Sequence, residues 1–166
     1  MKIGRILRHL FTFRWKLERA FDADVRTAIE EAITASERTH RGELRFAVEA
    51  RLDLASLMAG ETANERALEA FGRLGIWDTE ENSGILIYVL LADRHVAIVA
   101  DRGYRDRVSD EEWRAVCRTM EASFGAGDFR RGAVEGVLEA ARHAAEHFPL
   151  EGSGPNELPD AVVFMG

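Results

Sequence analysis

The sequence contains one cysteine, three prolines and no long apolar run. The single cysteine, Cys117, excludes an intramolecular disulfide and a cysteine-rich zinc site. Its position inside an expected helix favours a small buried hydrophobic side chain. No segment approaches the ~20 apolar residues of a membrane-spanning helix. Charges also interrupt the apolar residues of the N-terminal segment, so we expect no signal peptide and a cytoplasmic protein.

Charge of the two signs is unevenly distributed. The 166 residues carry a net charge of −7, but residues 1–20 contain six basic residues and one acidic residue, a balance of +5. The rest of the chain therefore carries −12. An acidic body disfavours nucleic acid as a partner, because phosphate repels it. It is compatible with divalent cations or with basic partners.

The basic N-terminal segment has an apolar stripe. Ile3, Leu7, Leu10 and Leu17 fall near one helical face, with basic residues around the rest. We expect residues 1–20 to form a basic amphipathic helix. Such a helix can make a peripheral contact with the inner membrane, dock on a protein partner at the membrane face, or pack on its own domain. We expect it to contribute to attachment more than to the fold.

Apolar periodicity defines the expected elements of the remaining chain. Spacing typical of helices covers residues 22–39, 62–74, 109–124 and 130–147, and Ser109 with Glu112 forms a capping-box pattern. Alternation predicts a strand over 44–50. Two apolar runs, 85–91 and 95–100, flank a short break, Ala92-Asp93-Arg94, that carries two charged residues, and this pattern predicts a hairpin.

This order of elements predicts an α/β fold. We expect a three-layer α/β/α sandwich, with helices on both faces of a small mixed sheet that contains the hairpin. Residues 21–148 then form a single domain. Residues 149–166 are expected to be a flexible tail, although 161–165 could also form a short strand or an interaction peptide.

Polar residues gather at the open end of the hairpin. Asn82 precedes the first strand and Asp101 follows the second, so the hairpin brings them side by side. If strand 44–50 runs parallel to strand 95–100, further polar side chains converge on the same rim. The complete set is Glu49, Asp53, Asp78, Glu81, Asn82, Ser83 and Asp101. Such oxygen donors suit a hard divalent cation.

Several short motifs, in this order, resemble the TPM-domain family. They are Phe71–Gly75, Trp77, Asn82–Ile87, Asp93-Arg94, Ile98, Asp101, Gly103, Phe124, Gly127–Phe129 and Gly132. The resemblance covers about residues 40–148. The family includes a thylakoid-lumen acid-phosphatase-like protein and many bacterial proteins. The resemblance implies an α/β/α sandwich with an acidic pocket that holds calcium or magnesium, and plant relatives have been ascribed a phosphatase activity.

This sequence departs from the family at the hairpin. The usual Asp-Asn-Gly before the first hairpin strand is here Asn82-Ser83-Gly84. Each replacement loses charge or reach as a ligand of a hard cation, which prefers carboxylate oxygen. Typical relatives are also exported, whereas no export signal is visible here, so the chain resembles a smaller cytoplasmic branch.

These observations lead to one expected site and two expected functions. We expect Ca²⁺ or Mg²⁺ to be bound by Asp78, Asn82, Ser83 and Asp101, with Glu49, Glu81 and Asp128 as possible additional ligands. An N-cap role also explains Asp128. We expect no catalytic residue and a non-catalytic interaction module that associates with membrane-linked partners. The alternative is a metal-dependent hydrolase of phosphate esters. The sequence does not define the oligomeric state.

Two histidines near the end of the last expected helix have a spacing that can bind zinc. His143 and His147 are four residues apart, but no glutamate occupies the position found in the H-E-x-x-H metalloproteases. We therefore expect an ordinary helix end there.

Overall fold

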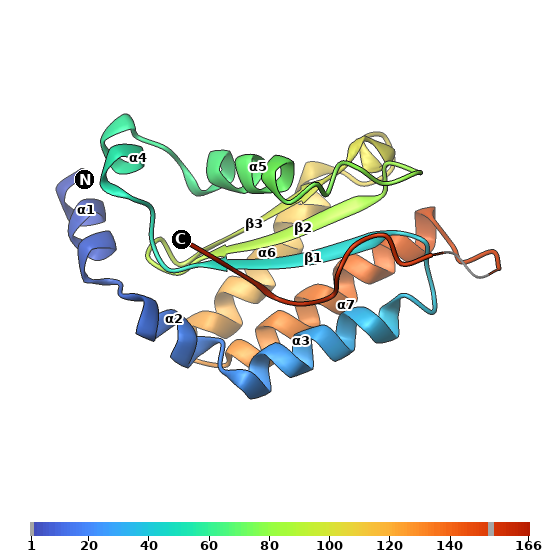
Figure 1. Ribbon diagram of the computed structural model, residues 1–166, viewed down its shortest axis with the longest axis horizontal. Helices are drawn as coiled ribbons and strands as arrows, with labels where there is room; N and C mark the ends of the chain where they lie inside the picture. The colour runs from blue at the N-terminus through green and yellow to red at the C-terminus, as the bar shows by residue number, and fades with distance from the viewer. Residues whose placement is uncertain (1, 153–154) are drawn as a thin grey trace.

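The computed structural model describes residues 2–152 and 155–166 (Figure 1). The helices are α1 (Lys2–Phe11), α2 (Arg14–Ala20), α3 (Ala23–Ser36), α4 (Leu54–Ala59), α5 (Ala63–Arg73), the short 3₁₀ helix η1 (Arg102–Tyr104), α6 (Asp110–Gly125) and α7 (Phe129–His147). The strands are β1 (Glu43–Glu49), β2 (Gly84–Leu90), β3 (His95–Ala100) and β4 (Val163–Met165).

The sheet is mixed, with strand order β3-β2-β1-β4. β1 is parallel to both β2 and β4, and β2 pairs with β3 as an antiparallel hairpin. Alternate strand residues face two separate cores. Phe46 and Ile87 pack with α3, α6 and α7, whereas Ala47 and Leu86 pack with α4 and α5 on the other face. Figure 1 shows these two helical layers on either side of the sheet. The expected three-layer α/β/α sandwich is therefore confirmed.

The strand pairing differs from the expectation in one respect. The convergence of all the polar residues on one rim requires strand 44–50 to run parallel to strand 95–100, but β1 is parallel to β2 and so runs opposite to β3. The cause is the crossover after β1, which leads through α4 and α5 into the first hairpin strand. The sheet therefore has two distinct ends. We call the open end of the hairpin, with Asn82, Ser83 and Asp101, the hairpin rim. The opposite end, which carries the hairpin turn together with Glu49 and Asp53, is the far rim.

The N-terminal segment forms two helices where one was expected. The chain leaves α1 at Thr12, whose hydroxyl donates to Arg8 O at 2.7 Å, and Phe13 is extended. Leu17 and His9 are both buried, so parts of this segment belong to the core. None of the helices in the described residues has the length and apolarity needed to cross a membrane.

The C-terminal segment is also more ordered than the expected flexible tail. Val163–Met165 forms the edge strand β4, paired with Ala47–Glu49 of β1. The Glu43 carboxylate accepts hydrogen bonds from Glu157 N and Leu158 N, at 3.0 and 3.1 Å. The segment satisfies the backbone groups on the otherwise open edge of β1, which explains why it is fixed there. Residues 153–154 of this segment lie outside the described residues.

Local signals in the sequence are reproduced closely. Ser109 and Glu112 form the expected capping box at the start of α6, and Asp22 caps α3. Cys117 is buried as expected, and burial raises the pKa of its thiol to about 12. A thiol with so high a pKa stays protonated at neutral pH, which agrees with a structural role.

Candidate functional site

The hairpin rim brings Asn82 and Asp101 together, as the hairpin pattern predicts. Asp101 N donates to Gly84 O at 2.9 Å, and Gly103 N donates to Asn82 O at 3.0 Å. Asn82 has a left-handed backbone with φ of 54°, a conformation that asparagine tolerates better than most residues. The loop before β2 and the turn after β3 are thus held against each other.

Two of the predicted ligands at this rim already have protein partners. Asn82 Oδ1 accepts a hydrogen bond from Arg102 Nε at 2.8 Å. Ser83 is 1% exposed, and its hydroxyl donates to Arg41 O at 3.4 Å. A cation at this rim would therefore have to compete for Asn82 and could reach Ser83 only after local rearrangement.

Two carboxylates at the rim each keep one free oxygen. Asp101 Oδ1 accepts from Arg102 N at 2.7 Å, and Glu81 Oε1 pairs with Arg41 Nη1 at 2.8 Å. The other oxygens, Asp101 Oδ2 and Glu81 Oε2, are buried and have no hydrogen-bond partner within residues 2–152 and 155–166. Burial raises the pKa of Tyr104, and the charges of Glu81 and Asp101 raise it further. The free oxygens of Asp101 and Glu81 are therefore the unsatisfied acceptors found here at the hairpin rim.

The predicted carboxylates do not form a compact ligand cluster. Asp78 is exposed on the loop before β2. In the described part of the chain, the group of three or more His, Cys, Asp or Glu ligand atoms within 4.8 Å of one another is His143, Glu146 and His147, and it includes no carboxylate of the hairpin rim. Asp101 and Glu81 are therefore the available donors at this rim.

Glu49 and Asp53 lie at the far rim, so the expectation that they join Asp101 is wrong. Glu49 is 2% exposed and binds Arg66 through both carboxylate oxygens, at 2.9 and 3.0 Å. The Tyr88 hydroxyl also donates to Glu49, at 2.6 Å. Asp53 caps α4 by accepting from Ser56 N at 2.9 Å. Both carboxylates therefore have structural roles, and the pairing of β1 with β2 places them at the far rim.

Asp128 is also remote from the hairpin rim. It is the N-cap of α7 and accepts from Arg131 N at 3.1 Å. The 19 residues of α7 span about 28 Å. Phe148, directly after the other end of this helix, packs on Tyr104 with ring centroids 4.9 Å apart. The N-cap role therefore accounts for Asp128.

A polar cluster that the sequence reasoning missed holds α1 against the hairpin turn. Arg5 donates to Asp93 from Nε at 3.1 Å and from Nη2 at 2.8 Å. The His9 ring lies between Asp93 Oδ1, 2.9 Å from Nε2, and Leu52 N, which donates to Nδ1 at 3.0 Å. We call Arg5, His9 and Asp93 the Asp93 clamp. Its signal in the sequence is the i, i+4 spacing of Arg5 and His9 on the expected helix.

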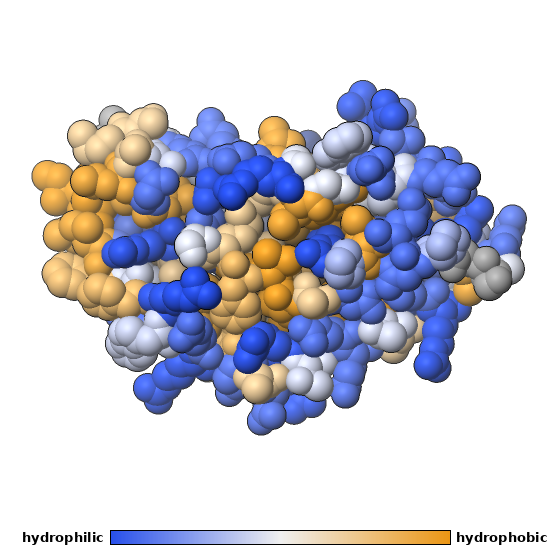
Figure 2. Space-filling model, viewed as in Figure 1, coloured by the Kyte–Doolittle hydropathy of each residue, from blue (hydrophilic) through white to orange (hydrophobic). Residues whose placement is uncertain are grey.

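With the clamp in place, most apolar residues of α1 are exposed, whereas Ile6 packs against the core. Large apolar side chains on α1, the link to α2, α2 itself and α4 are exposed. We call this surface the apolar end; it comprises Ile3, Leu7, Leu10, Phe11, Phe13, Trp15, Leu54 and Met58. Figure 2 shows hydrophobic atoms gathered at the left of the molecule, over the N-terminal helices and α4. Leu10, Phe13, Trp15 and Leu54 line a hollow of about 760 Å³ together with charged residues such as Glu49 and Arg66.

Comparisons with known proteins agree with this architecture. The family model described as TPM domain matches residues 16–143. The chain is similar to the BA42 protein from the psychrophilic bacterium Bizionia argentinensis, known from an NMR structure, with 29% sequence identity and a TM-score of 0.75. The match covers 86% of this chain and 94% of that one. A search of curated proteins found no match. Since the family model covers most of the sequence, the chain belongs to the TPM-domain family.

Proposed function

We propose that this TPM-domain protein is a non-catalytic module that attaches to an anionic membrane surface through its apolar end. The observation that carries the proposal is the inverted pattern of α1. Ile3 and Phe11 are 74% and 62% exposed, whereas the polar His9 is 1% exposed. A helix that packs on its own domain buries its apolar face. Here the side of α1 that carries Arg5 and His9 is bound to the domain, and Ile6 beside it is partly buried. The side that carries Ile3, Leu7 and Phe11 is exposed and can meet a lipid surface.

Basic side chains surround this apolar face. Arg8, Arg14, Lys16, Arg19 and Arg51 are all exposed. Lys16 Nζ lies 5.8 Å from the Trp15 ring centroid, and the Arg51 guanidinium lies 6.0 Å from that of Phe13. Each such charge contributes about 1 kcal/mol of attraction near an anionic leaflet. In a chain of net charge −7, this arrangement favours an anionic lipid surface as the occupant of the apolar end.

A binding test should leave the fold intact. Deletion of residues 1–20 is unsuitable because Leu17 is only 1% exposed and belongs to the core. We instead choose the double substitution of Phe11→Ser and Met58→Ser, at residues 62% and 70% exposed. The matched control replaces Leu68 and Leu138, which are 63% and 53% exposed on α5 and α7, with serine.

The assay is co-sedimentation with vesicles of phosphatidylserine and phosphatidylcholine. Removal of two inserted side chains, each worth about 1.5 kcal/mol or more, should weaken binding at least tenfold. The Leu68/Leu138 control should bind like the wild type, and added salt should weaken both. Equal binding by the two double variants would contradict the proposal. The proposal would also be contradicted if the wild-type protein does not bind the vesicles and instead self-associates through Phe11 and Met58.

A second candidate function is cation binding at the hairpin rim. The free buried oxygens of Asp101 and Glu81 support it, because calcium and magnesium prefer carboxylate oxygen. Calorimetric titration with CaCl₂ or MgCl₂ should give a heat of binding that Asp101→Asn removes. The exposed Asp106 provides the control, since Asp106→Asn should leave the heat unchanged. Identical titrations for the two variants would argue against this site.

Phosphate-ester hydrolysis is the less supported alternative. Metal-assisted hydrolysis needs ligands that converge on one ion and a base beside it. At the hairpin rim, Asn82 stands where the family usually has an aspartate, and Asp78 is exposed. We expect no metal-dependent turnover of p-nitrophenyl phosphate. Turnover that survives repeated purification and disappears in Asp101→Ala would support the hydrolase instead.

A further inference from the structure

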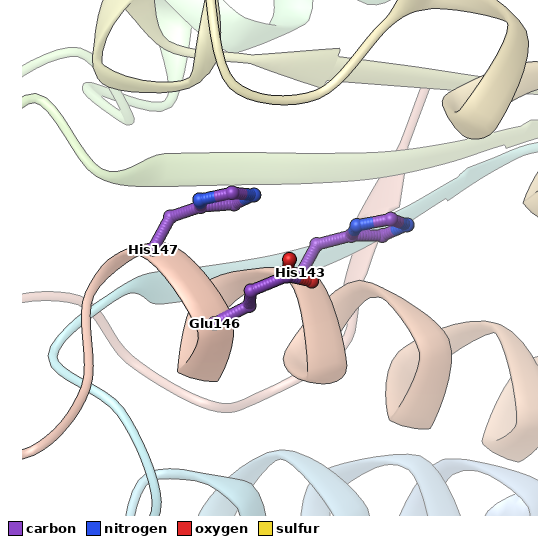
Figure 3. A group of neighbouring side chains, drawn as sticks. All are labelled: His143, Glu146 and His147. Carbon is purple, nitrogen blue, oxygen red and sulfur yellow. The ribbon is translucent and has the colours of Figure 1, made fainter.

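The C-terminal turn of α7 carries a group of metal-ligand side chains outside the hairpin rim. His143, Glu146 and His147 each offer one ligand atom, and these atoms lie within 4.8 Å of one another (Figure 3). The helix explains the grouping, because side chains at i, i+3 and i+4 share one face. Figure 3 shows the two imidazole rings at a similar height above the helix, with the Glu146 carboxylate beside His143.

His143 is an unusual member of this group because it is deeply buried. It is 2% exposed, and its ring packs on Trp113 with centroids 4.9 Å apart. Its Nδ1 atom is buried and has no hydrogen-bond partner among the residues that the structure describes. A buried nitrogen without a hydrogen-bond partner is unfavourable, because it has lost its bonds to water. Most buried polar atoms in proteins have a hydrogen-bond partner, and a bound metal ion would explain why this nitrogen has none.

The main competitor for the group is Arg142. Its Nη1 lies 3.7 Å from Glu146 Oε2, and its Nη2 lies 3.4 Å from His143 Nε2. The Arg142 and Glu146 side chains are 57% and 59% exposed, so solvent screens their pairing and it contributes little to stability. Arg142 also pairs with Glu139, at 3.0 Å, and can keep that contact when Glu146 is engaged elsewhere. The competing ion pair is therefore weak.

We propose that His143, Glu146 and His147 form a binding site for Zn²⁺ or a similar divalent transition-metal ion. Two imidazoles and one carboxylate form a donor set that zinc accepts, whereas calcium and magnesium prefer oxygen alone. Buried His143 provides the fixed ligand. Glu146 is exposed and His147 half-buried, so these two side chains can adjust to close the coordination sphere. Three protein ligands leave a fourth position open to water.

The proposal is tested by calorimetric titration of the full chain with ZnCl₂, together with the absorption spectrum of the CoCl₂-loaded protein. His147→Ala is the principal variant, because His143 lies in the core and its replacement could unfold the protein. We expect one Zn²⁺ per chain, affinity reduced roughly tenfold or more in His147→Ala, and a weaker loss in Glu146→Gln. Cobalt should show the visible bands of a low-symmetry, tetrahedral-like site.

Two controls separate this site from others. His95 is also surface-accessible, bound to Asn64 and Glu121, and His95→Ala should leave zinc affinity unchanged. Asp101→Asn should also leave it unchanged, which distinguishes this site from the proposed calcium or magnesium site. The proposal is overturned if wild-type protein shows no stoichiometric zinc binding. It is equally overturned if His147→Ala binds zinc as tightly as His95→Ala.

Discussion

The Asp93 clamp makes a direct prediction about how α1 is held. Asp93 joins the hairpin turn to α1 through Arg5 and His9, and its side chain is only 13% exposed. Leu52 N donates to His9 Nδ1, so His9 Nε2 carries the proton that it donates to Asp93. Asp93→Asn keeps the size of the side chain and removes its negative charge. It also replaces one carboxylate oxygen, an acceptor, with an amide NH₂ group, a donor.

The expected cost follows from the bonds that are lost. Hydrogen bonds to a charged group contribute about 1.5–3 kcal/mol each, and asparagine can retain one of the acceptors. We expect Asp93→Asn to lower the free energy of unfolding by about 2 kcal/mol. The assay is urea denaturation, with hydrogen exchange at the Leu52 amide as a local probe. Exposed Asp106→Asn is the matched control and should change stability by less than about 0.5 kcal/mol. Equal stability of the two variants, with unchanged protection at Leu52, would refute the clamp.

Three further predictions address pH, the buried ion pair and backbone packing. Burial opposes ionisation of Asp93, but hydrogen bonds from Arg5 and His9 outweigh it and lower its pKa. The clamp therefore stabilises the protein above about pH 4. The free energy of unfolding should fall as pH falls through the lowered pKa of Asp93. In urea denaturation at a series of pH values, Asp93→Asn should lose less stability over this range than the wild type. Glu49→Ala should destabilise the protein by about 3 kcal/mol, because it leaves the partly buried Arg66, whose side chain is 13% exposed, without its principal partner. In a double-mutant cycle, replacing Arg66 as well should recover part of this loss. Gly84→Ala would place a Cβ atom 2.1 Å from Ile76 O and should destabilise the protein by at least ~2 kcal/mol. Gly72→Ala has open space around its Cβ atom and should stabilise α5 by up to about 1 kcal/mol. Equal unfolding midpoints for the two variants would contradict the packing argument.

The elements that depend on local chemistry could be predicted from the sequence. The apolar run of β2 predicts a strand buried on both faces, and every residue of Gly84–Leu90 is buried. The capping residue Ser109 marks the start of its helix because it satisfies a backbone donor within one turn. The hairpin likewise predicts the neighbourhood of Asn82 and Asp101, since both follow from its register.

The elements that depend on distant partners could not be predicted. A crossover reveals a parallel neighbour but not which hairpin strand it joins, so Glu49 was placed at the wrong rim. The three residues of β4 are too few for a periodic signal, so the sequence offers a short strand at 161–165 only as an alternative to a flexible tail. The strand is fixed by the edge of β1 and by contacts with α3, such as the hydrogen bond from Val162 N to Glu30. The apolar face of α1 can be predicted from the sequence. Its exposure to solvent cannot, because it depends on the contact between His9 and the distant Asp93.

The most direct measurement of membrane attachment compares two tryptophans. Trp15 in the apolar end and Trp77 before β2 are 55% and 56% exposed, whereas Trp113 is 8% exposed. Fluorescence is measured with phosphatidylserine vesicles that contain brominated lipids, which quench tryptophans that reach the acyl chains. Membrane attachment through the apolar end predicts quenching in Trp77→Phe and little quenching in Trp15→Phe. Quenching that persists in Trp15→Phe and disappears in Trp77→Phe, or no quenching of the wild type, would contradict it.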